Sequence, residues 1–304
     1  MGIGTAAIQN TLELYNLGYL KYSKNILEIG SQELHLKKED LKELFHNAGL
    51  KCDSVDKYPT NNWPDAPRCP AKYFYESLGI LEYQSIDINS NYGAIGHDLN
   101  KPFEDKSKFN KFDIVTDHGS CEHVFNISEC YKTMHNLTKP GGYIIINQAI
   151  WKGNGYFKFD EAFFEGIAAA NNYKIIFNSY VASPLKKTKH GSDIEFHIPR
   201  NRELFNALNF EKIVDLGIYG VLQKIKDDEF KIPYQGKLMK EMYNISEGFN
   251  RTYFKDPMSY SYLPSATLNV EGASFKLLIK ALIIKIKRII RLRIFKNIKQ
   301  KIKY

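Results

Sequence analysis

Residues 117–123, which read Asp-His-Gly-Ser-Cys-Glu-His, hold the side chains best suited to acid–base chemistry. A neutral imidazole, with an ordinary pKa near 6.5, can take a proton from a hydroxyl or an amine at neutral pH. His123, His118 and Glu122 are therefore the candidate catalytic residues. Two structural alternatives stay open. Glu122 could cap the next helix with His123 packed beneath it, and His118 could be a hydrogen-bonded loop residue.

Three further acidic residues accompany short apolar runs. Glu28 lies two positions before Gly30, where the missing side chain lets the backbone approach a ligand. Asp87 ends a second run, and a carboxylate at such a place can accept two hydrogen bonds from a ribose diol. Asp98 precedes Leu99 after a shorter run. Each is a weak signal alone, because an Asp after a strand is commonly a turn residue.

The elements that must position these residues alternate along the chain. Short apolar runs predict strands at residues 25–29, 83–88, 94–99, 112–116, 143–147, 174–181 and 217–224. Helical patterns lie at residues 5–22 (where the helix leads into a strand), 39–48, 72–78, 128–137 and 160–171. Such alternation predicts a parallel sheet with helices on both faces. Right-handed crossovers then bring the carboxyl ends of its strands to one edge, where ligands bind.

Together these features form an ordered set across residues 5–225. The set includes Phe112-Asp-Ile-Val, Glu122-His123-Val124 and Lys139-Pro-Gly-Gly142 before an apolar strand. It resembles the class I S-adenosylmethionine-dependent methyltransferases, in particular the methyltransferase domains with an EHV element after the fourth strand. The resemblance implies an α/β fold, with a Rossmann-like, doubly wound and mostly parallel seven-stranded sheet. It also implies an enzyme whose cofactor is S-adenosyl-L-methionine.

The resemblance carries cofactor contacts onto particular positions. In chain order these are Glu28, Gly30, Asp87, Ile88, Asp98, Leu99 and Asp117. The first two would flank the methionine part, and Asp87 would bind both ribose hydroxyls with Ile88 packed on the adenine. Asp98 and Leu99 would face the adenine edge. Asp117 would lie near the transferable methyl, together with His118.

The sequence departs from the family pattern at its first motif. The family usually has E-x-G-x-G-x-G, whereas here Gly30 is followed by Ser31-Gln32-Glu33 without the later glycines. The loop must therefore follow a path that tolerates side chains. A nicotinamide dehydrogenase is disfavoured more strongly, because its phosphate-binding loop needs G-x-G-x-x-G at this place.

Two further departures bear on the site. Relatives that hold a divalent metal use an E-x-x-E-H arrangement, and Gly119 stands where its first Glu would be, so no metal is predicted. The long stretch between Gly30 and Asp87 contains a Pro-rich insertion at about residues 50–70, which is either a lid or a surface excursion.

The charge is concentrated at the end of the chain. The 304 residues carry 42 basic and 34 acidic side chains, but residues 275–304 hold eleven basic and no acidic ones. The rest is slightly acidic. Apolar residues from Phe275 to Ile290 recur at helical spacing, which predicts an amphipathic basic helix on an anionic membrane surface. A packing helix, a solvated tail and an RNA-binding arm are the alternatives. We therefore divide the chain into a methyltransferase domain (1–225), a Tyr-rich irregular extension (226–274) and a basic tail (275–304).

The functional expectation follows from the resemblance and the tail. We expect a cytoplasmic enzyme, peripheral on the inner membrane face, that methylates a hydroxyl of a small molecule or a glycan. Nucleic-acid amino methylation is disfavoured, because Asp117-His-Gly-Ser replaces the Asn/Asp-Pro-Pro-aromatic element of those enzymes. An RNA methyltransferase and a catalytically inactive membrane adaptor stay as alternatives. The four cysteines have no CxxC spacing and are expected to be free thiols.

Overall fold

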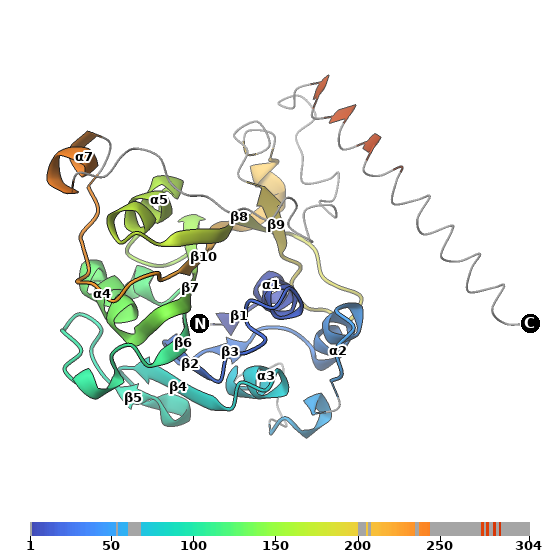
Figure 1. Cartoon of the computed structure of the whole chain (residues 1–304). Helices are drawn as coiled ribbons and strands as arrows, with labels where there is room; N and C mark the ends of the chain where they lie inside the picture. Colours follow the sequence, from blue (N-terminus) through green and yellow to red (C-terminus); the bar gives the residue numbers. More distant parts are fainter. Residues whose placement is uncertain are drawn as a thin grey trace, which may run out of the picture.

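Among the described residues, eight strands form the central sheet of the computed structural model, in the order β5-β4-β2-β6-β7-β10-β8-β9 (Figure 1). The structure describes residues 2–52, 54–59, 68–199, 205, 208–234 and 237–243, together with residues 275, 276, 278, 279, 282, 283 and 286. The strands are β2 (Asn25–Ile29), β4 (Glu82–Asp87), β5 (Ile95–Gly96), β6 (Phe112–His118), β7 (Thr138–Trp151), β8 (Lys174–Pro184), β9 (Phe196–Pro199) and β10 (Ile213–Gln223).

The strand directions agree with the predicted fold class. β5, β4, β2, β6 and β7 are parallel neighbours. β10 lies antiparallel between β7 and β8, and β9 pairs antiparallel with β8. The seven predicted strands are confirmed, and β9 is an additional strand that the sequence pattern did not indicate. A separate small sheet joins β1 (Gly2–Ile3) to β3 (Glu33–Leu34).

Helices cover both faces of this sheet (Figure 1). They are α1 (Thr5–Asn16), α2 (Lys38–Asn47), α3 (Lys72–Ser77), α4 (Ile127–Leu137), α5 (Glu161–Ala170) and α7 (Lys237–Tyr243). Successive strand residues point to opposite faces. On β6, Ile114 therefore joins the core beneath α1, α2 and α3, while Val115 joins the core beneath α4 and α5.

Local sequence explains where two of the helices begin and end. Glu39 and Asp40 lie in the first turn of α2, where acidic side chains favour the positive end of the helix dipole. Gly49 follows α2 with φ +71°, a backbone conformation that glycine adopts readily. The Asp160 carboxylate accepts a hydrogen bond of 2.8 Å from the Ala162 amide, so the predicted cap of α5 is confirmed.

The register of the parallel strands brings the predicted site together. Ile29 on β2 is the partner of Ile86 on β4 and of Asp117 on β6. The residues that follow on these three strands therefore emerge at one edge of the sheet, as strands of equal direction require. This edge, which we call the strand-end edge, carries the positions that the resemblance assigns to the cofactor.

Residues 54–59 of the predicted insertion lie beside α3. Val55 and Tyr58 are buried in the core of that face. The Tyr58 and Ser54 hydroxyls each lie 2.6 Å from Ser77 Oγ, at the end of α3 just before β4 begins. This part of the insertion is thus near the edge opposite to the candidate site. Its end returns to the loop after β2, where the Leu34 amide donates to the Cys69 carbonyl at 2.9 Å, so both alternatives stay open. Residues 60–67 lie outside the described residues.

The first part of the Tyr-rich extension runs along α4 and α5. The Asn171 amide donates to the Lys231 carbonyl at 3.0 Å, and His135 Nε2 lies 2.7 Å from the Asp228 carbonyl. Most of residues 244–304 lie outside the described residues, so the proposed division into three parts stays a prediction. No helix in the described part of the chain is both long and apolar enough to cross a membrane.

Candidate active site

The loop after β2 begins the site. Gly30 has φ +81°, and its amide donates to the Ile86 carbonyl at 2.7 Å. The Ser31 amide donates to Asp87 Oδ2 at 2.9 Å, and the Ser31 hydroxyl donates to the Asn91 carbonyl at 2.9 Å. Side chains at positions 31 and 32 are thus accommodated because the loop is tied to the end of β4. The departure from the glycine pattern leaves the loop ordered.

Asp87 stands at the end of β4, as the sequence predicted. Its side chain is half-buried and also accepts a hydrogen bond of 3.3 Å from the Asn89 amide. Each carboxylate oxygen has further acceptor capacity, so Asp87 can still receive ribose hydroxyls. Ile88 beside it is 75% exposed, which leaves its apolar surface available to a flat ring.

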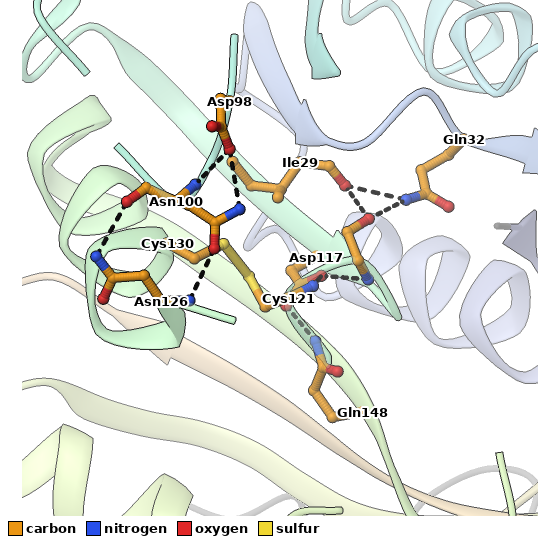
Figure 2. Close-up of a disulfide and its surroundings, with 10 residues drawn as sticks. Ile29, Gln32, Asp98, Asn100, Asp117, Cys121, Asn126, Cys130 and Gln148 are labelled. Atoms are coloured by element: carbon orange, nitrogen blue, oxygen red, sulfur yellow. Dashed lines mark hydrogen bonds between the residues drawn. A yellow bond between two sulfur atoms is a disulfide. The ribbon is translucent and has the colours of Figure 1, made fainter. Parts of the chain in front are cut away.

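Asp98 and Leu99 extend the same edge beyond β5. Asp98 accepts hydrogen bonds from the backbone amide and the side chain of Asn100 at 3.0 and 2.9 Å, and these bonds lower its pKa. Asn100 in turn holds Asn126 at the start of α4 (Figure 2). Leu99 is buried. Asp98 therefore orients the loop that joins β5 to the α4 side of the site.

Asp117 and His118 end β6 and point to opposite faces of the sheet. Asp117 is buried and accepts backbone hydrogen bonds from Ser120 at 2.8 Å and Cys121 at 3.1 Å. A third bond comes from the Gln148 amide (Figure 2). Burial raises the pKa of Asp117 to about 7. Its main visible role is to shape the turn after β6.

His118 has a different environment, on the α1 face. Its side chain is buried against Tyr219 of β10, with 6.2 Å between the ring centroids. Neither ring nitrogen has a hydrogen-bond partner among the described residues. Burial lowers the pKa of His118 to about 4, so its imidazole is neutral at physiological pH.

Glu122 and His123 lie in a short 3-10 helix, η4 (Cys121–His123). The buried Glu122 carboxylate accepts a hydrogen bond of 2.9 Å from the Ala149 amide at the end of β7. Gly155 in the next loop packs so closely on Glu122 that a Cβ there would lie 2.7 Å from its side chain. His123 Nε2 lies 3.7 Å from Glu122 Oε1, and its side chain is 36% exposed. Glu122 thus binds the end of β7 and the loop after it, a contact that differs from the helix cap considered as a structural alternative.

Glu28 lies deeper in the sheet than the other predicted cofactor residues. It is fully buried and accepts a hydrogen bond of 2.5 Å from the Tyr83 hydroxyl. Burial raises the pKa of Glu28 to about 8. Its partner in the β2–β6 register is Thr116, whose hydroxyl lacks a hydrogen-bond partner in the described part of the chain. Glu28 is thus part of the protein interior behind Gly30, where it is bonded to Tyr83.

The expectation of four free thiols is wrong for two of the cysteines. Cys121 in η4 and Cys130 in α4 form a disulfide, with their Cα atoms 6.3 Å apart (Figure 2). Cys52 and Cys69 are not in a disulfide. The bond joins the turn after β6 to the helix behind it. A separation of nine residues matches no recognisable motif, so no pattern in the sequence indicated this pair.

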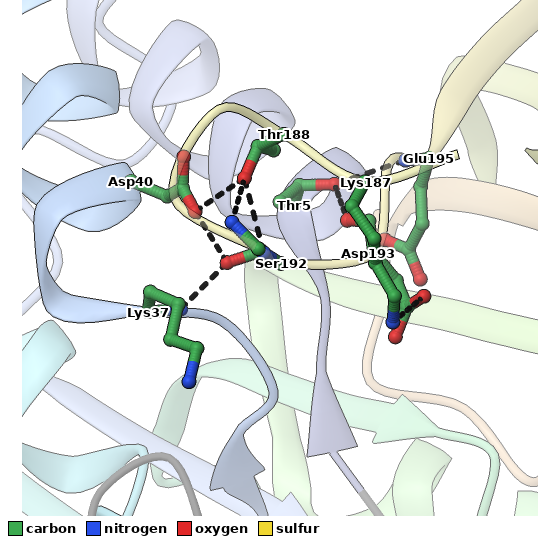
Figure 3. Close-up of polar contacts among 9 residues, drawn as sticks. Thr5, Lys37, Asp40, Lys187, Thr188, Ser192, Asp193 and Glu195 are labelled. Atoms are coloured by element: carbon green, nitrogen blue, oxygen red, sulfur yellow. Dashed lines mark hydrogen bonds and ion pairs between the residues drawn. The ribbon is translucent and has the colours of Figure 1, made fainter.

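A cavity of about 440 Å³ lies between α1, α2 and the loop from β8 to β9. In this loop the Thr188 and Ser192 hydroxyls donate to Asp40 at 2.6 and 2.5 Å (Figure 3). Asp40 also belongs to a group of three possible metal ligands with Glu43 and His190. Two of these three already have partners. Asp40 accepts the hydrogen bonds from Thr188 and Ser192, and Lys189 Nζ lies 2.9 Å from Glu43 Oε2.

The same loop fixes the start of α1. Glu195 accepts a hydrogen bond of 3.0 Å from the Ala6 amide, and His197 Nε2 lies 2.9 Å from the Ala6 carbonyl. Thr5 donates to the Asp193 carbonyl and accepts from the Glu195 amide (Figure 3). These contacts hold α1 over the polar interior around His118 and Tyr219.

Comparison with known families identifies the fold and its chemistry. Residues 86–195 match a family model described as "Methyltransferase domain". The matched segment runs from the end of β4 to the loop before β9, and it contains Asp87, Asp98 and the whole of residues 117–123. Residues 86–195 thus form part of a methyltransferase domain, and the strand order agrees with the class I S-adenosylmethionine-dependent fold that the sequence predicted. The predicted family, enzyme class and cofactor of this methyltransferase are thereby confirmed.

Solved structures of low similarity were also found. The 1,6-didemethyltoxoflavin-N1-methyltransferase of Burkholderia thailandensis, solved with 1,6-didemethyltoxoflavin and S-adenosylhomocysteine, has 10% identity and a TM-score of 0.34, covering 73% of this chain and 80% of that one. A SAM-dependent methyltransferase from Archaeoglobus fulgidus has 12% identity and a TM-score of 0.38, covering 71% and 93%. Because both scores are below 0.5, the identification of the methyltransferase depends on the family match and the sheet order. No curated protein matches the chain.

The sequence missed several residues of this methyltransferase site. Tyr219 of β10 approaches His118, Asn10 of α1 lies beside Tyr219, and Gln148 of β7 reaches Asp117. No spacing pattern links these residues to residues 117–123, since they come from distant parts of the chain. In the sequence, Gln32 was noticed only because it stands where the family pattern has a glycine.

Proposed function

We propose that the methyltransferase transfers a methyl group to a hydroxyl of a small uncharged molecule or a glycan, with His118 as the general base. The observation that carries the proposal is the state of His118. It is a buried, neutral imidazole at the strand-end edge, and both ring nitrogens lack a partner among the described residues. A buried polar group without a partner is unusual in a folded protein and calls for a ligand.

The cofactor side of the proposal depends on the edge formed by β2, β4 and β6. S-adenosylmethionine, when bound, supplies a methyl group on a positively charged sulfur. Asp87 would hold the ribose, with the exposed Ile88 beside the adenine. Asp98 and Leu99 would face the adenine edge, while Gly30 and Glu28 would flank the methionine part. The free acceptor capacity of Asp87 and the unpartnered oxygen of Gln32 fit such a ligand.

His118 would act on the acceptor by taking its hydroxyl proton. A neutral imidazole has one nitrogen that donates and one that accepts, so His118 can hold the hydroxyl and remove its proton. The low pKa of the free side chain keeps it unprotonated. Alignment of the hydroxyl with the methyl supplies the larger part of the catalysis in such displacements.

The surroundings of His118 favour an uncharged acceptor. The Tyr219 hydroxyl lies beside the Asn10 and Thr11 side chains but has no well-formed hydrogen bond to a described residue, and Asn10 Nδ2 also lacks one. Glu28, which is buried on the same face of the sheet, has a pKa of about 8 and is mostly protonated at pH 7. A charged acceptor would lose its hydration here without a counter-charge. Donors and acceptors without net charge suit a hydroxylated compound.

In this proposal Glu122 and His123 have different roles. Glu122 would be a positioning residue, because its carboxylate is occupied by the Ala149 amide. His123 stays the alternative base, because its side chain is partly exposed at the same edge and could meet an acceptor that approaches from solvent. Removal of each histidine separately distinguishes the two.

The experiment that tests the proposal follows a labelled methyl group. The full chain is incubated with S-adenosylmethionine labelled at the methyl and with separate small-molecule, glycan and RNA fractions of a cell lysate. We expect label in the small-molecule or glycan fraction, attached to oxygen. Label in RNA alone would favour the alternative of an RNA methyltransferase. The absence of label and of cofactor binding would favour an inactive adaptor.

We also propose that the tail attaches the enzyme to an anionic membrane surface. Phe275, Ile279, Leu282, Ile283 and Ile286 are helical and exposed, and they recur at intervals of three or four residues. Basic residues surround them in the sequence. Exposed apolar side chains combined with positive charge favour the headgroup region of an anionic bilayer. The remaining residues of the tail lie outside the described part of the chain.

A further inference from the structure

We propose that Gln32 binds the α-ammonium group of the cofactor's methionine part through its side-chain oxygen. The inference rests on the cofactor site at the strand-end edge, and it adds a contact that the resemblance does not supply. Gln32 occupies the position of the second glycine in the family's E-x-G-x-G-x-G pattern, where the family has no side chain at all.

The orientation of the Gln32 amide is determined by its neighbours. The side chain is buried between the end of β2 and the turn after β6 (Figure 2). Its Nε2 donates to the Ile29 carbonyl and to Ser120 Oγ, both at 3.0 Å. The Ser120 hydroxyl gives its own proton to the Ile29 carbonyl at 2.5 Å. Both neighbours of the amide therefore accept, so the nitrogen must face them and the oxygen must face away.

The amide oxygen is left without a donor. Gln32 Oε1 is shielded from solvent and has no hydrogen-bond partner among the described residues. A buried oxygen without a hydrogen bond destabilises the fold. A hydrogen-bond donor supplied by a ligand would satisfy this oxygen and remove that cost. Because Nε2 stays anchored on two acceptors, Oε1 is held in place before the ligand arrives.

The position of Gln32 indicates which part of the cofactor provides the donor. Ser31, one residue earlier, turns toward β4 and donates its amide to Asp87, the predicted ribose ligand. Gln32 turns instead toward Ser120 after β6, the side where the methyl is expected. The amino-acid part of a cofactor whose ribose is held by Asp87 would therefore extend toward Gln32.

The chemistry of the position selects the ammonium over the carboxylate. Gln32 Oε1 can only accept a hydrogen bond, and it has no partner among the described residues. An acceptor of this kind favours a donor group of the cofactor and disfavours its carboxylate. An ammonium has three N–H donors and no acceptor, so it can satisfy Oε1 directly. The ammonium is also present in S-adenosylhomocysteine, which lacks the sulfonium charge.

A comparison of two ligands distinguishes the contact made by Gln32 from the other contacts of the cofactor site. S-adenosylhomocysteine carries the amino-acid part, whereas 5′-methylthioadenosine has the same adenosine and sulfur without it. Both are titrated by calorimetry into the full chain and into Gln32→Met, whose side chain is similar in length but offers no amide. We expect the variant to bind S-adenosylhomocysteine about ten- to a hundredfold more weakly, as for loss of a hydrogen bond to a charged group. Binding of 5′-methylthioadenosine should not change.

A neighbouring substitution is the control. Ser31→Ala lies in the same loop but faces β4, so it should alter the two affinities equally or leave both unchanged. If Gln32→Met weakens neither ligand, or weakens both equally, the assignment of Gln32 is wrong while the cofactor site stands. If the unmodified chain binds neither ligand, the cofactor site itself is wrong, and the assignment of Gln32 falls with it.

A direct measurement remains decisive should Gln32→Met fail to fold. In a structure of the unmodified chain with S-adenosylhomocysteine, Gln32 Oε1 should lie about 2.7–3.2 Å from the amino nitrogen. A separation beyond about 4 Å, or an amino group bound only by backbone carbonyls, would overturn the assignment.

Discussion

The imidazole of His118 on β6 lies against the phenol ring of Tyr219 on β10, with 6.2 Å between the two ring centroids. β7 separates these strands in the sheet, and Asn10 and Thr11 of α1 lie beside the Tyr219 hydroxyl. Polar atoms of His118 and Tyr219 lack partners in the described part of the chain. This face of the sheet thus has a polar interior around these two residues at the strand-end edge. We therefore expect the acceptor to bind here.

The pH dependence of catalysis tests His118 as the base. Because the pKa of His118 is lowered to about 4, this base is unprotonated throughout the neutral range. The value of kcat/KM should therefore stay flat from pH 7.5 down to about pH 5 and decline only below it. A decline centred well above pH 5 would contradict the assignment of His118.

Asp87→Ala should weaken cofactor binding by about ten- to a hundredfold, the usual effect of losing hydrogen bonds to a charged group. The substitution also removes the acceptor of the Ser31 amide, so Asp87→Asn, which keeps one side-chain oxygen, should weaken binding less. Calorimetry with S-adenosylhomocysteine measures both variants. Unchanged affinity in Asp87→Ala, in a folded protein, would remove Asp87 from the ribose site.

Glu28 should make the free energy of unfolding depend on pH. Its pKa is about 8 in the folded chain against 4.5 for an ordinary Glu, so the folded state holds this proton more tightly. The stabilisation is complete below about pH 4.5 and is lost as the pH rises through 8. Relative to Glu28→Gln, the native chain should lose about 2–4 kcal/mol between pH 5 and pH 8. Urea unfolding at several pH values tests this, and a constant difference would mean that Glu28 titrates normally.

The cysteines should fall into two classes. After unfolding without reductant, an alkylating reagent should label Cys52 and Cys69 only, because Cys121 and Cys130 are bonded. Closure of so short a loop stabilises the fold by about 3 kcal/mol, so the double variant Cys121→Ser/Cys130→Ser should unfold at lower denaturant concentration. Mass spectrometry counts the labels. Four labelled cysteines in the freshly purified protein would contradict the disulfide.

Truncation before Phe275 should abolish sedimentation with anionic lipid vesicles and leave methyl transfer to a soluble acceptor unchanged. The tail carries all of the excess positive charge, and each basic residue near an anionic surface contributes up to about 1 kcal/mol. Added salt should weaken attachment of the full chain, and neutral vesicles should bind it less. Equal sedimentation of the truncated chain would show that the tail is not the anchor.

The sequence predicted the sheet well because its strands are continuous apolar runs. Residues 144–146, three consecutive isoleucines on β7, are buried on both faces of the sheet, and such a run predicts a strand without any knowledge of its neighbours. Asp87 and His118 were found for the same reason. Each follows such a run, and parallel strands bring their carboxyl ends together.

The missed features depend on contacts between distant segments. The insertion of β10 between β7 and β8 brings Tyr219 toward His118, and no periodicity in the chain records that pairing. The bond between Cys121 and Cys130 depends on how η4 meets α4. Gln32 was noticed as a missing glycine, but its role follows from Ser120, which only the folded chain places beside it.

The central claim is methyl transfer to an acceptor hydroxyl at His118, and one comparison tests it most directly. Unmodified chain, His118→Ala and His123→Ala are incubated in parallel with methyl-labelled S-adenosylmethionine and the small-molecule fraction, and mass spectrometry measures the labelled product. We expect an oxygen-methylated product from the unmodified chain and from His123→Ala. His118→Ala should form it about 10²–10⁴-fold more slowly with unchanged cofactor affinity. Equal product formation by His118→Ala, or no oxygen-methylated product from the unmodified chain, would contradict the account.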